Sequence, residues 1–76
     1  MKALKIINCS DPLMWYSERV GAIVPFLGED NDYKGPIYWS RDSGGYKNII
    51  FRKDAELIDV PGDATKQLFD HHNYPQ

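Results

Sequence analysis

The chain has 76 residues, the length of one small domain, and this leaves little room for a deep enzyme cleft. Its 42% hydrophobic and 13% aromatic content is typical of a folded protein and excludes a disordered chain. The net charge is −2 and the nine Lys and Arg residues are scattered, which argues against avid nonspecific binding of nucleic acid.

The first predicted strand covers residues 3–8, where Leu4 and Ile6 alternate with Lys5 before the turn-forming "NCSDP". This segment lacks an apolar run long enough for a signal peptide or a membrane span. The single cysteine, Cys9, cannot build the internal disulfide framework that small secreted domains need. We therefore expect a soluble cytoplasmic protein that does not insert into a membrane.

Residues 10–19 show no clean period, although the segment "LMWY" is strongly apolar. This combination predicts a long loop folded back onto the body of the protein. The next strand is predicted over residues 20–27, where alternate apolar residues share one face. Gly21 and Pro25 indicate that this strand is bulged or lies at a sheet edge.

The middle of the chain predicts a polar loop followed by a hairpin. The segment "GEDNDYKG", residues 28–35, predicts a solvent-exposed loop. "PIYWSR" and "YKNIIF" flank "DSGG", whose two glycines allow positive φ, and this pattern predicts a tight β-hairpin. Ile37 and Trp39 share one face of the hairpin, which favours Trp39 as a core residue, while Tyr38 lies on the other face.

After the hairpin, "RKDA" predicts a single tight turn, and "ELIDV" predicts a fifth strand that ends before Pro61. We therefore predict an all-β domain over residues 1–60 and a C-terminal tail over residues 61–76. Residues 64–69 of the tail are predicted to form a short helix or helical turn, unless the whole tail is loose.

The order of the five predicted strands, with a long first loop, a medium polar second loop, a tight third turn and a one-turn fourth connection, resembles the Src-homology-3-like (SH3-like) small barrel. The resemblance covers residues 3–60. The long loop reads "CSDPLMWYSERVG" instead of the "ALYDY" type of the signalling members, so binding of proline-rich peptides is not implied. The "VG" pair and the final "DAELI" look more like compact barrels of bacterial and bacteriophage accessory proteins. That likeness implies a small protein that binds and modulates or inhibits a protein of the host cytoplasm.

Aromatic side chains next to the predicted loops are the candidate contact residues for a protein partner. Tyr and Trp supply large rigid contact area together with a polar group, so protein interfaces favour them. Trp15 is equally well interpreted as a core residue, because so short a chain has few large side chains. The candidate partner-binding residues are Trp15, Tyr16, Glu29, Asp30, Tyr33 and Tyr38.

Two alternatives to protein binding remain. Single-stranded nucleic acid is held by aromatic rings beside positive charge, and the residues that fit this pattern are Arg41, Tyr46, Lys47 and Arg52. A weak homodimer, formed through residues 20–27 or through Leu68 and Phe69, is the other alternative to a monomer.

No catalytic, metal or cofactor site is predicted. Adjacent His71 and His72 point in different directions in either a helix or an extended chain, so they do not meet at one ion without further ligands. Cys9 has neither a nearby His in the sequence nor a helix N-terminus that would activate its thiol. The "SGGYKN" segment lacks the spacing and the following helix of a phosphate-binding loop. We therefore expect a protein that is not an enzyme and that needs no cofactor.

Overall fold

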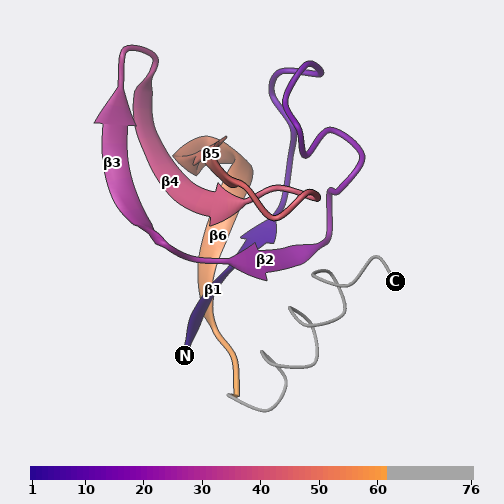
Figure 1. Ribbon diagram of the computed structural model, residues 1–76, viewed down its shortest axis with the longest axis vertical. Coiled ribbons are helices and arrows are strands. Elements are labelled where there is room, and N and C mark those ends of the chain that lie inside the picture. The colour runs from indigo at the N-terminus through magenta and orange to yellow at the C-terminus, as the bar shows by residue number, and fades with distance from the viewer. Residues whose placement is uncertain (62–76) are drawn as a thin grey trace.

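The computed structural model describes residues 1–61, which form β-strands joined by loops and one 3-10 turn (Figure 1). This confirms the all-β prediction. The predicted tail helix at residues 64–69 lies outside the described residues. The elements are β1 (Lys2–Ile6), β2 (Ile23–Pro25), β3 (Gly28–Asp32), β4 (Gly35–Arg41), β5 (Lys47–Phe51), η1 (Arg52–Asp54) and β6 (Ala55–Asp59).

The strands form two antiparallel three-stranded sheets, with orders β2-β1-β6 and β3-β4-β5. Within the described residues there are six strands rather than the predicted five, and they do not close into a barrel. Figure 1 shows β2 running on into β3 through a bend. At this bend Gly28 has a φ of +147°, a conformation that is essentially restricted to glycine. The chain thus leaves one sheet and enters the other within two residues.

The predicted polar loop over residues 28–35 is wrong for most of its length, because Gly28–Asp32 is strand β3 and pairs with β4. The strand lies at the edge of its sheet, and Glu29 and Asp30 are both exposed while the strand still pairs with β4 through its backbone. Charge at these positions therefore does not oppose strand formation. Only Tyr33 and Lys34 form the turn.

The hairpin of β4 and β5, the single turn η1 and strand β6 confirm the predictions for residues 36–59. The core that they share with β1 and β2 has Leu4, Ile6, Val24 and Ile50 at its centre, each at most 2% exposed. Trp39, which we predicted as a core residue, is only half-buried. Its indole Nε1 donates to Asp30 Oδ2 at 3.3 Å, because Gly28–Asp32 is a strand directly beside it.

Asp54, at the end of η1, is fully buried and ties the long β1–β2 loop to the rest of the protein. Its carboxylate accepts hydrogen bonds from Tyr16 OH (2.6 Å), Ser10 Oγ (2.8 Å), Ser10 N (3.1 Å) and Asn8 Nδ2 (3.3 Å). The Tyr16 hydroxyl in turn accepts from Phe51 N at 3.3 Å. A buried carboxylate is tolerated only when such donors compensate for lost water, so the loop must fold onto η1.

The bend between the sheets can be tested with Gly28→Ala. A Cβ at Gly28 meets no other atom, so the loss comes from backbone strain alone, and we expect the free energy of unfolding in urea to fall by about 1–3 kcal/mol. Gly44→Ala is the control, because Gly44 does not have positive φ and its nearest side chain is the exposed ring of Tyr46. Equal losses in the two variants would contradict a special backbone requirement at Gly28.

The Asp54 network can be tested with Tyr16→Phe. This change keeps the buried ring but removes one donor to Asp54 and the acceptor for Phe51 N. We expect the free energy of unfolding to fall by about 1–3 kcal/mol, the usual range for a buried group left without a partner. Tyr46→Phe, at a side chain that is 75% exposed, is the control and should be neutral. A neutral Tyr16→Phe would show that the hydroxyl does not support the fold.

Candidate functional site

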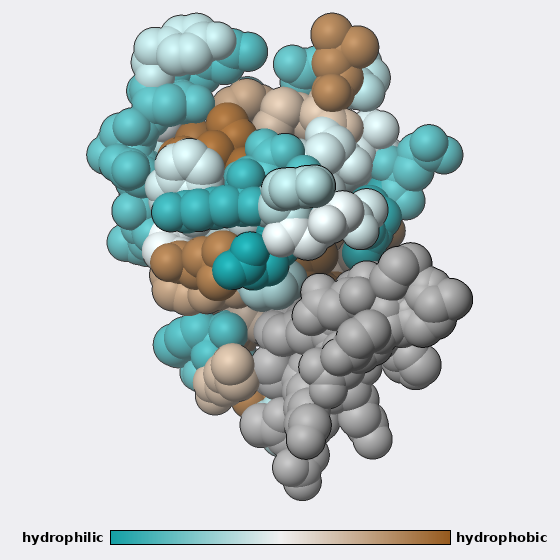
Figure 2. All heavy atoms as spheres, viewed as in Figure 1, coloured by the Kyte–Doolittle hydropathy of each residue, from teal (hydrophilic) through white to brown (hydrophobic). Residues whose placement is uncertain are grey.

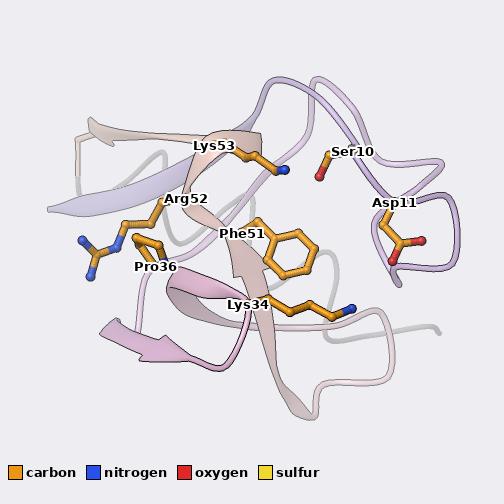
Figure 3. A pocket seen from close by; sticks show the side chains of 7 residues that line it. All are labelled: Ser10, Asp11, Lys34, Pro36, Phe51, Arg52 and Lys53. Carbon is orange, nitrogen blue, oxygen red and sulfur yellow. The ribbon is translucent and has the colours of Figure 1, made fainter.

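A pocket of about 360 Å³ opens where three segments of the chain meet. In Figure 2 the β3–β4 turn and the β1–β2 loop are two projections at the top of the molecule, with tan and brown apolar spheres in the hollow between them. The pocket is lined by Ser10 and Asp11 from the long loop, by Lys34 from the β3–β4 turn and Pro36 from the start of β4, and by Phe51, Arg52 and Lys53 from the end of β5 and η1 (Figure 3).

The ring of Phe51 lies at the centre of the pocket, between two lysine side chains (Figure 3). The ammonium groups of Lys34 and Lys53 lie 5.8 Å and 6.0 Å from the ring centroid, within cation–π range. Lys34 Nζ is also 5.7 Å from the ring of Tyr33, which is 91% exposed. The site therefore combines an exposed tyrosine, a buried phenylalanine and two lysines.

The charges around the pocket are mostly positive, although the whole chain is negative. Three cationic side chains line it against one carboxylate, that of Asp11. Asp11 Oδ1 accepts the backbone N–H of Leu13 at 2.9 Å. Within residues 1–61 neither Lys34 nor Lys53 forms an ion pair. Their charges are therefore available to a ligand.

Arg52 is held more tightly than the two lysines. Its Nε donates to Ile37 O at 3.2 Å, its Nη2 donates to Asp30 O at 3.3 Å, and its guanidinium carbon lies 5.5 Å from the centroid of the Tyr38 ring. The side chain thus joins η1 to β3 and β4. It contributes positive charge at the pocket, but its Nε and Nη2 atoms already donate to backbone carbonyls.

The Asp54 network below the pocket is fixed in one protonation state. Burial acts to raise the pKa of the Asp54 carboxyl, but the hydrogen bonds from Tyr16, Ser10 and Asn8 outweigh it and the pKa lies below its usual value. Burial, followed by the hydrogen bond to Asp54, raises the pKa of Tyr16 far above its usual value. Asp54 is therefore ionised and Tyr16 neutral at physiological pH, and the wall made by Ser10 and Asp11 stays anchored.

The structure does not place the six predicted partner-binding residues on one surface. Tyr16 lies in the core with no exposed surface, because its hydroxyl is needed by Asp54, so its prediction as a contact residue is corrected. Trp15 is half-buried at the outer edge of β5, where its Nε1 donates to Ile49 O at 2.8 Å. Its ring packs edge-on against Tyr16, with centroids 5.4 Å apart. Trp15 thus covers part of the open edge of β5.

The other four predicted partner-binding residues lie on β3, on β4 and in the turn between them. Glu29 is paired with Tyr38, and Asp30 follows it along β3. The ring of Tyr38 packs edge-on against Phe26 at 5.9 Å. Hydrogen bonds from the Asn31 backbone and the Trp39 indole hold the pKa of Asp30 below its usual value. Of these four residues only Tyr33 is both aromatic and exposed, with 91% of its surface open to solvent.

The predicted nucleic-acid residues are divided between the two ends of the β4–β5 hairpin. Arg41 and Lys47 are paired next to the turn that carries Tyr46, whereas Arg52 follows the opposite end, where Phe51 is paired with Ile37. Lys47 Nζ lies 4.7 Å from the Trp39 ring centroid, and Arg41 Nη1 donates to Gly45 O at 3.0 Å. The four residues therefore do not form a single contact face.

Sequence reasoning missed the pocket residues Ser10, Asp11, Lys34, Pro36 and Lys53 as a group. They come from three segments with no shared motif, and only the fold brings them together. Lys34 comes just after the acidic run "EDND", and Lys53 comes directly before Asp54. In the sequence each therefore looks like part of a mixed-charge surface. The role of Asp54 as a buried hydrogen-bond acceptor was missed for the same reason, because its donors lie at least 38 residues away in the sequence.

Comparison of the chain with protein-family models, with curated proteins and with solved structures finds no match. Over residues 1–61, no helix is long and apolar enough to cross a membrane. The same residues hold no group of three side chains placed to bind a metal ion. His71 and His72 lie outside this part of the chain.

The lowered pKa of Asp54 predicts loss of stability in acid. The unfolded state takes up a proton near pH 4, before the folded state does, so the stabilisation is present above that pH and is lost as pH falls through the lower folded value. The free energy of unfolding in urea should be measured as a function of pH. In Asp54→Asn it should decrease less in acid than in the wild-type protein, whereas Asp59→Asn, at an exposed ion pair, should keep most of the wild-type decrease. Because Asp54→Asn removes a buried charge that four donors face, the Asp54 carboxyl of the wild-type protein should also be titrated by NMR. An ordinary or raised pKa there would contradict the prediction.

Proposed function

We propose that the protein is a small, non-enzymatic binding module that holds a protein partner at the pocket between the β1–β2 loop, the β3–β4 turn and η1. The observation that carries this proposal is the open pocket with Phe51 at its centre, together with the 91% exposed Tyr33, whose ring lies beside the lining residue Lys34 and so marks the rim. Exposed tyrosines next to concave apolar surface are typical anchors of protein interfaces. The pocket is too open and too poor in paired acid and base groups to suggest catalysis.

We further propose that the two sheets correspond to the SH3-like arrangement. Two features support this: β2 and β3 are nearly continuous and serve as two halves of one bent strand, and the single turn η1 separates β5 from β6. The connection from β3 to β4 is tighter than the medium loop that the resemblance implied. On this resemblance the partner is a bacterial host protein, and the site of action is the host cytoplasm.

Protein is favoured over nucleic acid by the acidic side chains of β3. Glu29 and Asp30 lie exposed on this strand, which leads into the turn that carries Tyr33, and they would repel a phosphate chain. The alternative candidate, a nucleic-acid-binding surface, draws support from Tyr46 at the other end of the hairpin, which is 75% exposed beside Arg41 and Lys47. The two proposals therefore place the ligand at opposite ends of β4 and β5.

Two exposed tyrosines in two β-turns make a matched test. We expect Tyr33→Ala to reduce capture of a protein partner from bacterial lysate by roughly tenfold or more, because it removes the aromatic anchor at the pocket rim. Tyr46→Ala should leave capture unchanged. The capture should be carried out with and without nuclease and read by mass spectrometry.

The opposite pattern would overturn the proposal. Loss of binding in Tyr46→Ala but not in Tyr33→Ala, together with loss after nuclease treatment, would assign the protein to nucleic acid. Binding to nucleic acid should also weaken steeply with salt, since each neutralised phosphate releases counterions. Capture of a partner that depends on neither tyrosine would place the interface elsewhere.

A further inference from the structure

We infer that the pocket receives an acidic side chain, Asp or Glu, from an otherwise apolar segment of the partner protein, an inference that rests on the proposed function. The carboxylate binds between the ammonium groups of Lys34 and Lys53, and the neighbouring apolar residues of the segment pack on Phe51 and Pro36. The pocket then sets the specificity of the module, while Tyr33 supplies contact area at its rim.

The first argument is charge complementarity. Lys34 and Lys53 approach the ring of the same Phe51 residue, and Figure 3 shows their stems flanking that ring. Neither forms an ion pair within residues 1–61, and the one carboxylate of the lining, Asp11, already accepts the Leu13 N–H. A ligand carboxylate in the pocket therefore lies near two cations whose charges are not neutralised by an ion pair within residues 1–61.

The second argument is the size of the pocket and the two apolar residues, Pro36 and Phe51, in its lining. A volume of about 360 Å³ is at the small end of the range for ligand pockets and suits one or two side chains rather than a folded surface. The Phe51 ring and Pro36 offer apolar contact beside the charges. An acidic residue with apolar neighbours matches both parts of this lining.

The third argument concerns a polyanionic ligand such as a nucleic acid. An arginine fork with two free N–H groups holds phosphate and carboxylate alike. At Arg52 both Nε and Nη2 already donate to backbone carbonyls, so the fork that these two atoms form is occupied and the two lysines supply most of the charge for either anion. The exposed Glu29 and Asp30 on β3 disfavour a continuous polyanion more than a single carboxylate.

The test is an NMR titration of the whole ¹⁵N-labelled protein with blocked peptides in which one Glu lies between Leu residues. We expect shifts centred on the amides of Lys34, Phe51 and Lys53, with a Kd of about 1 mM, typical of a single anchored side chain. The same peptide with Gln in place of Glu should bind roughly tenfold more weakly. An oligothymidylate forms the nucleic-acid arm.

Matched lysine variants locate the charge effect. The double variant Lys34→Gln/Lys53→Gln should bind the Glu peptide roughly tenfold more weakly than the wild-type protein does. Lys2→Gln with Lys5→Gln removes the same net charge from β1 and should have no effect, since Lys2 forms only an exposed ion pair with Asp59 and neither residue lines the pocket. If the two double variants weakened binding equally, the peptide would be attracted by the net charge of the protein and not by the pocket lysines, and the inference would be overturned.

Three further outcomes would also overturn it: no shift at these amides with peptide well above the expected Kd, equal affinity for the Glu and Gln peptides, or shifts there by oligothymidylate but not by the peptide. These failures are distinguishable from failure of the proposed function. If the captured partner still depends on Tyr33 while the Glu peptide does not bind, the module stands and only its acidic specificity is lost. If the partner does not depend on Tyr33, the proposed function itself fails.

Discussion

The buried carboxylate of Asp54 is the constraint on which the rest of the structure depends. A charge with no exposure must be matched by donors, and all four that the structure provides come from the β1–β2 loop. Asp54 also fixes the loop through its backbone, since its carbonyl accepts the N–H groups of Ile7 and Asn8. These bonds therefore couple η1 to the long loop, and with the loop docked in this way Ser10 and Asp11 line the same pocket as Phe51 and Lys53.

The remaining interactions protect the sheet edges on either side of this centre. Trp15 caps the open edge of β5 through its bond to Ile49 O, while the acidic side chains of β3 keep the opposite edge of the same sheet solvated. Arg52 then joins η1 to both β3 and β4. These contacts hold the segments that form the walls of the pocket against one another.

Local signals in the sequence predict the elements well and the contacts between distant segments poorly. Alternation and turn chemistry predict β1, the β4–β5 hairpin, η1 and β6, because those elements form from neighbouring residues. The strand β3 was missed because an edge strand with polar side chains looks like a loop. The burial of Tyr16 depends on Asp54, 38 residues later, and no local pattern encodes that pair. The pocket was missed for the same reason, since its lining extends from Ser10 to Lys53.

Amide hydrogen exchange at Ser10 and Leu13 tests the role of Asp54 most directly. Both amides lie in the same loop and donate to a carboxylate, but Ser10 N donates to the buried Asp54 and Leu13 N donates to Asp11, two residues away. If the Asp54 network anchors the loop, Ser10 should exchange much more slowly than Leu13 after correction for intrinsic rates. Equal exchange at the two amides would contradict this account, because it would mean that the Ser10 bond to Asp54 breaks as readily as the local Leu13 bond to Asp11.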